Sequence, residues 1–202
     1  MIMTETPHSD RDPLKVVVVI GSTRPQRIGR IVADWFVGKA ARRDDMTVHV
    51  VDLAEAALPV VLTGDLAPDD ADALAQVTPQ LDAADAFVIV TPEYNHSFPA
   101  SIKNLIDWHY TQWRAKPVAF VSYGGLAGGL RAVEHLRQVL AELHAVTVRD
   151  TVSFHGVAGR FDDAGTLIDT EGAAGAAKTM LDQLDWWARS LREARSVRPY
   201  AA

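Results

Sequence analysis

Five short, valine-rich runs constrain the fold of this chain more than any other feature of its sequence. Strands with one solvent-exposed face alternate apolar and polar residues, whereas nearly continuous apolar runs are typical of strands buried on both faces of a parallel sheet. The runs are KVVVVI (15–20), TVHVVD (47–52), AFVIV (86–90), PVAFVS (117–122) and VTVRD (146–150). The sequence therefore predicts five parallel strands.

Segments with helical spacing lie between and after these runs. In each segment apolar or bulky residues recur every three or four positions, as on one face of a helix. The stripes comprise Ile31, Val32, Trp35 and Phe36; Ile102, Leu105, Ile106 and His109; Val133, Leu136, Leu140 and Leu143; and Met180, Leu181, Leu184, Trp187 and Leu191. A further helix is predicted over 69–84, broken where Thr78 can cap one turn and Pro79 can open the next.

The alternation of strands and helices predicts a doubly wound α/β fold. We expect right-handed crossovers and the strand order 2-1-3-4-5. In that order the crevice lies at the carboxyl ends of strands 1 and 3, where the winding reverses. Residues 13–195 are interpreted as one domain between a flexible N-terminal tail (1–12) and a C-terminal tail (196–202), with a long surface loop over 151–170.

Composition narrows the functional classes. The formal net charge of −6 argues against nucleic-acid and membrane partners, since both favour basic clusters. The chain contains no cysteine, which excludes disulfides, thiolate catalysis and cysteine metal sites. The N-terminal segment lacks the apolar region of a secretory signal, and the run VVVVI is too short to span a bilayer. We therefore expect a cytoplasmic protein without nucleic-acid or membrane partners.

The segment after strand 1, GSTRPQRIGR (21–30), suits a phosphate group. Donors for an anion are supplied by Ser22, Thr23, Arg24 and Arg27. The next helix is expected to begin near Ile28 or Gly29, and the free N–H groups of its first turn favour an anion. The segment matches neither a P-loop nor the dinucleotide fingerprint, so a single phosphate fits better than a diphosphate. An ordinary strand–helix turn with solvated arginines is the alternative.

The segment after strand 3, TPEYNHSFPASIKNLIDW (91–108), is richer in rigid and aromatic residues than a connection requires. Pro92 and Pro99 fix the backbone near either end of the loop. Between them, Tyr94 and Asn95 can supply an aromatic wall and polar groups for a flat heteroaromatic ring. The alternative is that Asn95 or Ser97 caps the following helix, a role compatible with binding.

The segment after strand 4, SYGGLAGGLRA (122–132), has four glycines that allow the backbone to approach a ligand closely. A simple turn into a helix is the alternative. Ser122 at a strand–turn–helix junction suggests a hydrolase, but Phe120 occupies the first glycine position of the G-x-S-x-G motif. The seven histidines show no metal-ligand spacing, so no metal site is predicted. Among them His96 lies in the ligand loop, and His109 is expected at a helix packing face.

At these three loops the sequence resembles the NADPH-dependent FMN reductase family, a flavodoxin-like group of flavin, quinone, azo and chromate reductases. GSTRPQRIGR resembles the family's G-S-x-R phosphate loop, and PEYNHSFPASIKNLIDW its P-E-Y-N-x-S-x-P…K-N-x-x-D-W signature. SYGGLAGGLRA resembles its glycine-rich flavin loop, and the likeness covers roughly residues 15–150. The resemblance implies a flavodoxin-like three-layer fold with a five-stranded parallel sheet.

The resemblance also implies non-covalently bound FMN and its contacts. The phosphate would be held by Ser22, Arg24, Arg27, Ile28 and Gly29, the isoalloxazine by Pro92, Glu93, Tyr94 and Asn95, and its other edge by Ser122, Tyr123, Gly124 and Gly125. Glu93 is expected to contribute mainly its backbone, because a carboxylate beside a reduced anionic flavin is unfavourable. Many members end the first loop with S-x-N, whereas this chain has Arg27-Ile28-Gly29, and we expect Arg27 and the following N–H groups to compensate.

The activity implied is hydride transfer from NAD(P)H through FMN to a second, small-molecule acceptor. The flavin carries the chemistry and the protein orients it, so no side chain is assigned a catalytic role. A flavodoxin-like electron carrier that does not turn over NAD(P)H is the alternative, and a non-catalytic protein on the same fold is another. The acceptor, which could be free flavin, a quinone, an azo compound or a metal oxyanion, and the choice between NADPH and NADH stay open.

Family members are commonly dimers or tetramers, and the chain has aromatic residues that suit an interface. Trp108, Tyr110 and Trp113 lie together at the end of the third predicted helix. Aromatic residues are enriched in interface cores. We therefore expect a homodimer or homotetramer, with packing of one or two of these residues inside the monomer as the alternative.

Overall fold

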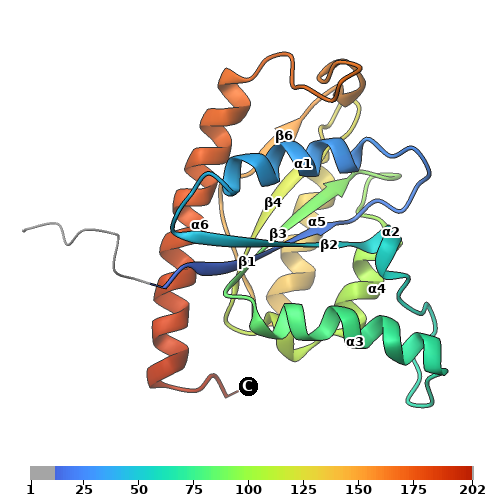
Figure 1. Ribbon diagram of the computed structural model, residues 1–202, viewed down its shortest axis with the longest axis vertical. Coiled ribbons are helices and arrows are strands. Elements are labelled where there is room, and N and C mark those ends of the chain that lie inside the picture. The colour runs from blue at the N-terminus through green and yellow to red at the C-terminus, as the bar shows by residue number, and fades with distance from the viewer. Residues whose placement is uncertain (1–11, 202) are drawn as a thin grey trace, which may run out of the picture.

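A parallel sheet runs through the centre of the structure, a computed structural model that describes residues 12–201 (Figure 1). Its strand order is β2-β1-β3-β4-β5, and neighbouring strands pair in parallel. The strands are β1 (Leu14–Ile20), β2 (Met46–Asp52), β3 (Ala86–Pro92), β4 (Pro117–Tyr123) and β5 (Val146–Thr147). The predicted flavodoxin-like fold and strand order are confirmed, and residues 1–11 of the predicted N-terminal tail lie outside the described residues.

The last strand of the sheet is divided in two, where the sequence predicted one strand over 146–150. After β5 the chain leaves the sheet and returns as β6 (Val152–Phe154), which pairs with β4 at Val121–Tyr123. Between the two strands the carbonyl groups of Val148 and Arg149 accept hydrogen bonds from the Arg137 guanidinium at 2.8 and 3.0 Å. A side chain thus replaces the strand partner at this point, which satisfies the backbone without a continuous ladder.

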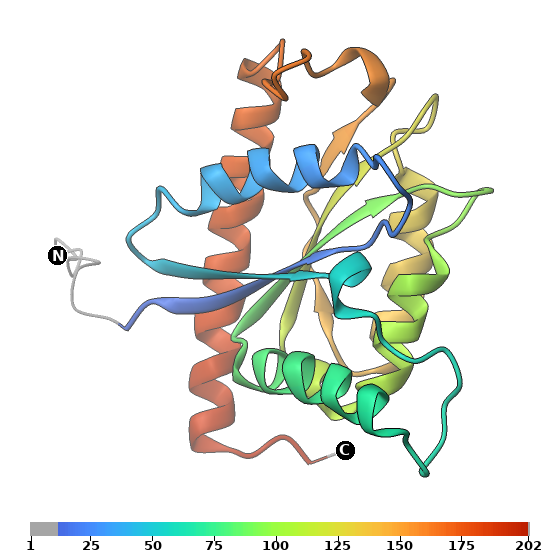
Figure 2. The same cartoon turned by 45° about the vertical axis from the view of Figure 1, so that its right-hand side comes forward.

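Helices cover both faces of the sheet (Figure 2). One face carries α1 (Gly29–Ala40) and the long α6 (Glu171–Val197), which extends into the predicted C-terminal tail. The other face carries α3 (Pro68–Ala83), α4 (Ala100–Trp108) and α5 (Leu130–Glu142). Three short segments, α2 (Leu53–Ala56), η2 (Thr111–Trp113) and η3 (Val157–Gly159), complete the structure. No helix within residues 12–201 is both long enough and apolar enough to cross a membrane.

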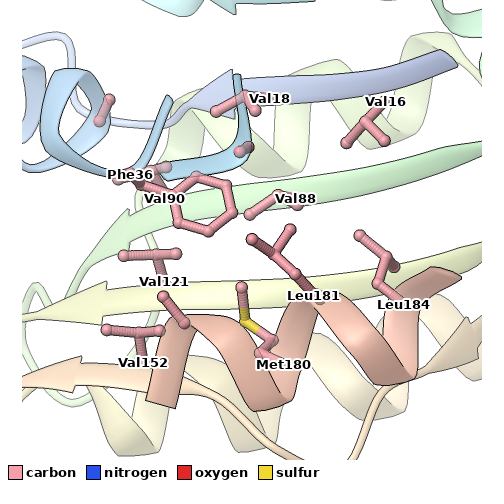
Figure 3. Close-up of a cluster of buried hydrophobic side chains, with 14 of the residues drawn as sticks. Val16, Val18, Phe36, Val88, Val90, Val121, Val152, Met180, Leu181 and Leu184 are labelled. Carbon is pink, nitrogen blue, oxygen red and sulfur yellow. The ribbon is translucent and has the colours of Figure 1, made fainter. Parts of the chain in front are cut away.

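Two buried clusters divide the strand residues between the two faces. On β1, Val16 and Val18 belong to the cluster under α1 and α6, whereas Val17 and Val19 belong to the cluster under α3, α4 and α5. Figure 3 shows the first cluster, in which Phe36 of α1 and Leu181 of α6 face the valines of the sheet. Because successive side chains of a strand point to opposite faces, two covered faces require a continuous valine run, as the sequence indicated.

Helix α3 is continuous, and the predicted break at Thr78-Pro79 is wrong. Pro79 lies inside the helix, and the Thr78 hydroxyl caps no second helix. Its Oγ1 instead lies 3.0 Å from Nε2 of His109, which is buried as predicted for a packing position. Burial lowers the pKa of His109, which favours the neutral ring that can both donate and accept a hydrogen bond.

The aromatic residues expected at an interface divide between the interior and the surface. Trp113 is fully buried against Phe87, with ring centroids 4.5 Å apart. Trp108 is partly buried and donates from Nε1 to the Pro59 carbonyl at 2.7 Å. Only Tyr110 is largely exposed, with the Arg114 guanidinium 4.7 Å from its ring centroid. Trp113 is therefore part of the monomer core.

Candidate functional site

A cavity of about 440 Å³ opens where the carboxyl ends of β1, β3 and β4 meet. We call this side of the sheet the carboxyl end and the opposite side the amino end. The predicted site residues that line the cavity are Ser22, Arg24, Arg27, Ile28, Pro92, Glu93, Tyr94, Tyr123, Gly124 and Gly125. The three loops chosen from the sequence therefore do converge on one space.

Three predicted residues do not line the cavity. Gly29 lies behind it as the buried first residue of α1. Asn95 is exposed at the tip of its loop. Ser122 is fully buried, and its hydroxyl donates to the Gly128 carbonyl at 2.8 Å, which holds the glycine-rich loop against β4.

Two pairs of lining residues were missed from the sequence. Pro25 and Gln26 lie within the first loop, whereas Val157 and Ala158 lie in the segment interpreted as a surface loop. That segment is fixed to the third loop by backbone hydrogen bonds: the Gly156 and Val157 N–H groups donate to the carbonyls of Gly125 and Gly124 at 2.9 and 3.1 Å. Because these contacts join residues distant in sequence, no local pattern indicated them.

The first loop carries paired charge at the N-terminus of α1. Arg27 donates to the buried carboxylate of Asp52, the last residue of β2, which also accepts from the Ala54 N–H at 3.1 Å. Asp52, at the end of strand 2, was not among the site residues predicted from the sequence. The Arg24 guanidinium is exposed and lies 5.6 Å from the centroid of the Tyr94 ring. The loop thus combines the Arg27–Asp52 ion pair with the exposed Arg24 cation and the positive end of a helix dipole, and the last two favour an anion.

The second loop is closed by a tight turn. The Tyr94 N–H donates to the Ser97 carbonyl at 2.8 Å, and the Ser97 N–H donates back to Tyr94 at 3.1 Å. The residues between them, Asn95 and His96, have φ of 49° and 76°, as in the two-residue turn that follows the twist of a hairpin. Neither Asn95 nor Ser97 caps α4, whose N-cap residue is Pro99. The loop is therefore folded on itself and presents the Tyr94 ring to the cavity.

Glu93 connects the second loop to the third. Its carboxylate accepts from the Arg131 guanidinium at 2.8 Å and from the Arg131 N–H, in the first turn of α5, at 3.1 Å. Its own N–H donates to the Tyr123 carbonyl at 3.2 Å. The negative charge is therefore balanced by Arg131 and the helix N-terminus, which limits its effect on a ligand in the cavity.

The first and second loops are joined by a hydroxyl pair, with Ser22 Oγ 2.8 Å from Tyr94 Oη. Two buried donors beside this pair, the Tyr123 hydroxyl and the Arg27 Nε–H, have no hydrogen-bond partner within residues 12–201. Both residues line the cavity. An anionic group with several acceptor oxygens would satisfy both donors, so the residues present fit the phosphate of FMN. Among the described residues no cluster of His, Asp and Glu is suited to a metal ion.

The sequence profile of the family described as NADPH-dependent FMN reductase matches residues 14–159, which include all three loops. The chain belongs to this family. The predicted family, oxidoreductase class and FMN cofactor are thereby confirmed, whereas the individual cofactor contacts stay predictions.

Curated FMN reductases and quinone reductases are similar to this chain. An NAD(P)H-dependent FMN reductase from Schizosaccharomyces pombe is 33% identical over 123 residues, which make up 57% of this chain and 60% of that protein. A 2-hydroxy-1,4-benzoquinone reductase from a Burkholderia species is 30% identical over 187 residues, covering 89% of this chain and 98% of that protein. The chain thus aligns with less than two thirds of the yeast reductase but with nearly all of the bacterial one.

Solved structures of flavoenzymes share the fold. A flavoenzyme NAD(P)H:(acceptor) oxidoreductase from Paracoccus denitrificans superposes with a TM-score of 0.69 at 24% sequence identity. The superposition covers 87% of this chain and 98% of that chain. At this sequence identity the likeness shows the fold of this FMN reductase family member and does not identify its ligands.

Proposed function

We propose that this protein is an FMN-dependent reductase that passes hydride from NAD(P)H to a quinone or a free flavin. The observation that carries the proposal is the convergence of the three family loops on one cavity, which includes two buried donors without partners. The names of the relatives support the same class of reaction, since they include FMN reductases and a benzoquinone reductase.

FMN, when bound, supplies the hydride-transfer chemistry, and the chain supplies binding and orientation. In the proposed arrangement Arg24, Arg27 and the first N–H groups of α1 hold the phosphate. The Tyr94 ring and Pro92 form one wall for the isoalloxazine, and Gly124 with Gly125 allows close backbone approach at its other edge. NAD(P)H and then the acceptor would enter the same cavity in turn.

The Glu93–Arg131 pair has a defined part in this arrangement. It joins the second loop to the N-terminus of α5, so the second and third loops are fixed relative to each other before a ligand binds. A site whose polar groups are positioned in advance needs less reorganisation during reaction. No proton transfer by a side chain is required by the proposal.

Anaerobic stopped-flow mixing of the FMN-loaded protein with NADPH and with NADH tests the proposed activity. Rapid loss of the absorbance of oxidised flavin is the expected result, followed by recovery when a benzoquinone or free FMN is added. A flavin that stays oxidised would indicate an electron carrier instead. A steady-state panel of quinones, flavins, azo compounds and chromate with both nicotinamides then identifies the acceptor class.

We further propose a homodimer or homotetramer in the cytoplasm. Support for assembly comes from the segment after α2, where Val60, Val61 and Leu62 are exposed, and from exposed Tyr110. Contiguous apolar exposure of this kind is typical of interaction surfaces. Light scattering on a size-exclusion column measures the oligomeric state, and a monomer at micromolar concentration would contradict the assembly.

Fractionation of cells that express the tagged protein tests the proposed cytoplasmic location.

A further inference from the structure

The last residue of β4, Tyr123, carries a hydroxyl that its own chain does not satisfy. The residue is only 4% exposed, and within residues 12–201 its Oη has no hydrogen-bond partner. A buried polar group without a partner destabilises a protein, so such groups are rare in native structures. Other buried side-chain atoms within residues 12–201 also have no partner, but among them only this hydroxyl and Arg27 Nε belong to residues that line the cavity. A ligand in the cavity is therefore the acceptor within reach.

The hydroxyl lies directly under the first turn of α1. A Cβ atom built on Gly29, the first residue of that helix, would lie 2.3 Å from Tyr123 Oη and 3.2 Å from its Cζ. Any side chain at this position would therefore displace the phenol. Because Gly29 has no side chain, the Tyr123 phenol fits beside the N–H groups that begin the helix.

Two arginines of the first loop act electrostatically on the hydroxyl. Tyr123 lines the same cavity as Arg24 and Arg27. Burial raises the pKa of Tyr123 and outweighs the opposing effects of the nearby Ser22 hydroxyl and of these two arginines. The phenol is consequently protonated at neutral pH, and its O–H is available to donate to an anion.

The direction of the side chain separates two roles. Tyr123 packs with the cluster under α1 and α6, beside Val121 of the same strand, whereas the glycine-rich loop continues from Gly124 toward the other wall of the cavity. The ring-edge role expected from the sequence suits the backbone of this loop. The side chain itself points to the phosphate end, next to Gly29.

We infer that Tyr123 donates its phenolic hydroxyl to the phosphate of FMN and thereby contributes to selection of FMN over flavins without a phosphate. The inference rests on the proposed function. It also accounts for the first loop, which lacks the side-chain amide of the family's S-x-N pattern because Gly29 stands there. The phenol enters from β4 and replaces that missing donor.

Binding of FMN and of riboflavin to the flavin-free protein, measured by flavin fluorescence, tests the inference with Tyr123→Phe. A hydrogen bond to a charged group predicts that this variant binds FMN about 10- to 100-fold more weakly. Riboflavin has no phosphate, so its affinity should be unchanged. The matched control is Tyr110→Phe, which removes a hydroxyl from an exposed tyrosine and should change neither affinity.

Two further measurements keep structural effects apart from binding. Loss of an unsatisfied buried hydroxyl should leave the melting temperature of the flavin-free protein unchanged or higher, so weaker FMN binding cannot be attributed to unfolding. Gly29→Ala should weaken FMN binding in the wild-type background, where the added methyl meets Oη. In the Tyr123→Phe background Gly29→Ala should weaken FMN binding much less, because the phenolic oxygen is absent.

The outcomes distinguish the inference from the proposed function. A Tyr123→Phe variant that retains wild-type FMN affinity, or that loses FMN and riboflavin affinity equally, overturns the phosphate role while the proposed function stands. A wild-type protein that binds no FMN overturns both. Selective loss of FMN affinity, with riboflavin binding and flavin-free stability retained, is the result that supports the inference.

Discussion

The two ends of the sheet use buried polar groups differently. At the amino end, the Asp85 carboxylate accepts from the Lys15 N–H at 2.9 Å and from Arg192 at 3.2 Å, and Arg195 lies 3.9 Å away. These contacts join β1, the start of β3 and α6. At the carboxyl end, the Tyr123 hydroxyl and the Arg27 Nε–H border a cavity and have no partner within residues 12–201.

The difference separates stability from binding within one sheet. Groups that are paired with another element contribute to the free energy of folding, whereas cavity-lining donors without a protein partner are satisfied only when a ligand supplies the acceptor. Substitutions at the amino end should therefore change stability and leave flavin affinity alone. Substitutions that remove cavity-lining donors at the carboxyl end should do the reverse.

The largest effect is expected for Asp85→Ala, which removes the shared acceptor at the amino end. Breaking a buried ion pair by removing one partner typically costs about 3–5 kcal/mol, and Arg192, Arg195 and the Lys15 N–H all lose a partner here. Urea unfolding measures the loss. FMN affinity of the folded fraction should be unchanged, and Asp34→Ala, at an exposed ion pair, is the control with little effect. Normal stability with impaired FMN binding would contradict the division between the two ends.

A pH-dependent effect is expected from Lys116, also at the amino end, whose Nζ donates to the carbonyls of Leu81 and Asp82 at the end of α3. Burial, assisted by the charge of Arg195, lowers the pKa of Lys116 from 10.5 to about 8. Because the folded-state pKa lies below the unfolded-state value, burial of the charged amine reduces the free energy of unfolding by its full amount below pH 8. This loss is recovered as the pH rises toward 10.5.

Between these pH limits the free energy of unfolding of the wild-type protein should rise by up to about 3 kcal/mol relative to that of Lys116→Met, which has no ionisable group at this position. Urea unfolding of both proteins at about pH 7.5 and about pH 10, below and above the folded-state pKa of about 8, measures the difference. Parallel stability profiles for the two proteins would show that burial of this amine has no consequence for pH dependence.

At the carboxyl end, Arg24→Ala should weaken FMN binding by about 1.5–3 kcal/mol, the range for hydrogen bonds to charged groups. Arg24 is exposed and its one described aromatic contact is with Tyr94, so the free energy of unfolding should hardly change. Arg149→Ala, at a more exposed arginine that does not line the cavity, is the matched control. Unchanged FMN affinity in Arg24→Ala would refute its place in the phosphate site.

The smallest effect concerns backbone strain, which occurs at both ends. His96 in the second loop has φ of 76°, and Ala115 before β4 has φ of 50°. Glycine adopts such angles readily, so His96→Gly should raise the free energy of unfolding by about 0.5–1 kcal/mol. Ala115→Gly should be nearly neutral, because a lost buried methyl group of about 0.8 kcal/mol offsets the relief. Thermal unfolding of both variants measures the two effects, and destabilisation by His96→Gly would contradict them.

The sequence predicted those parts of the molecule whose cause is local or periodic. Valine runs buried on two faces predicted β1, β3 and β4, and the three loops that follow them were recognised from glycine, proline and hydroxyl residues in order. Pro79 shows the limit of a local rule. It indicated a break in α3, but packing of Val77 and Leu81 against the sheet maintains the helix through it.

The parts that the sequence did not predict depend on contacts between distant residues. Asp52, the last residue of edge strand β2, was not predicted as a site residue, yet its carboxylate accepts a hydrogen bond from Arg27 beside the cavity. Val157 reaches the site through a backbone hydrogen bond to Gly124. The Tyr123 hydroxyl lies beside the first turn of α1 because Gly29, 94 positions earlier, has no side chain. Each relation joins two elements that only the folded sheet brings together.

The division of the last strand into β5 and β6 bears on self-association of the sheet. An uninterrupted edge strand offers a row of unpaired N–H and C=O groups to another chain and is a common route to aggregation. On this side the row is broken after Thr147, and Arg137 already occupies the carbonyls of Val148 and Arg149. The opposite side ends in β2, seven residues without interruption, with Val50 exposed. Strand addition by a second molecule would therefore have to begin at β2, and a charged residue in place of Val50 is the simplest way to block it.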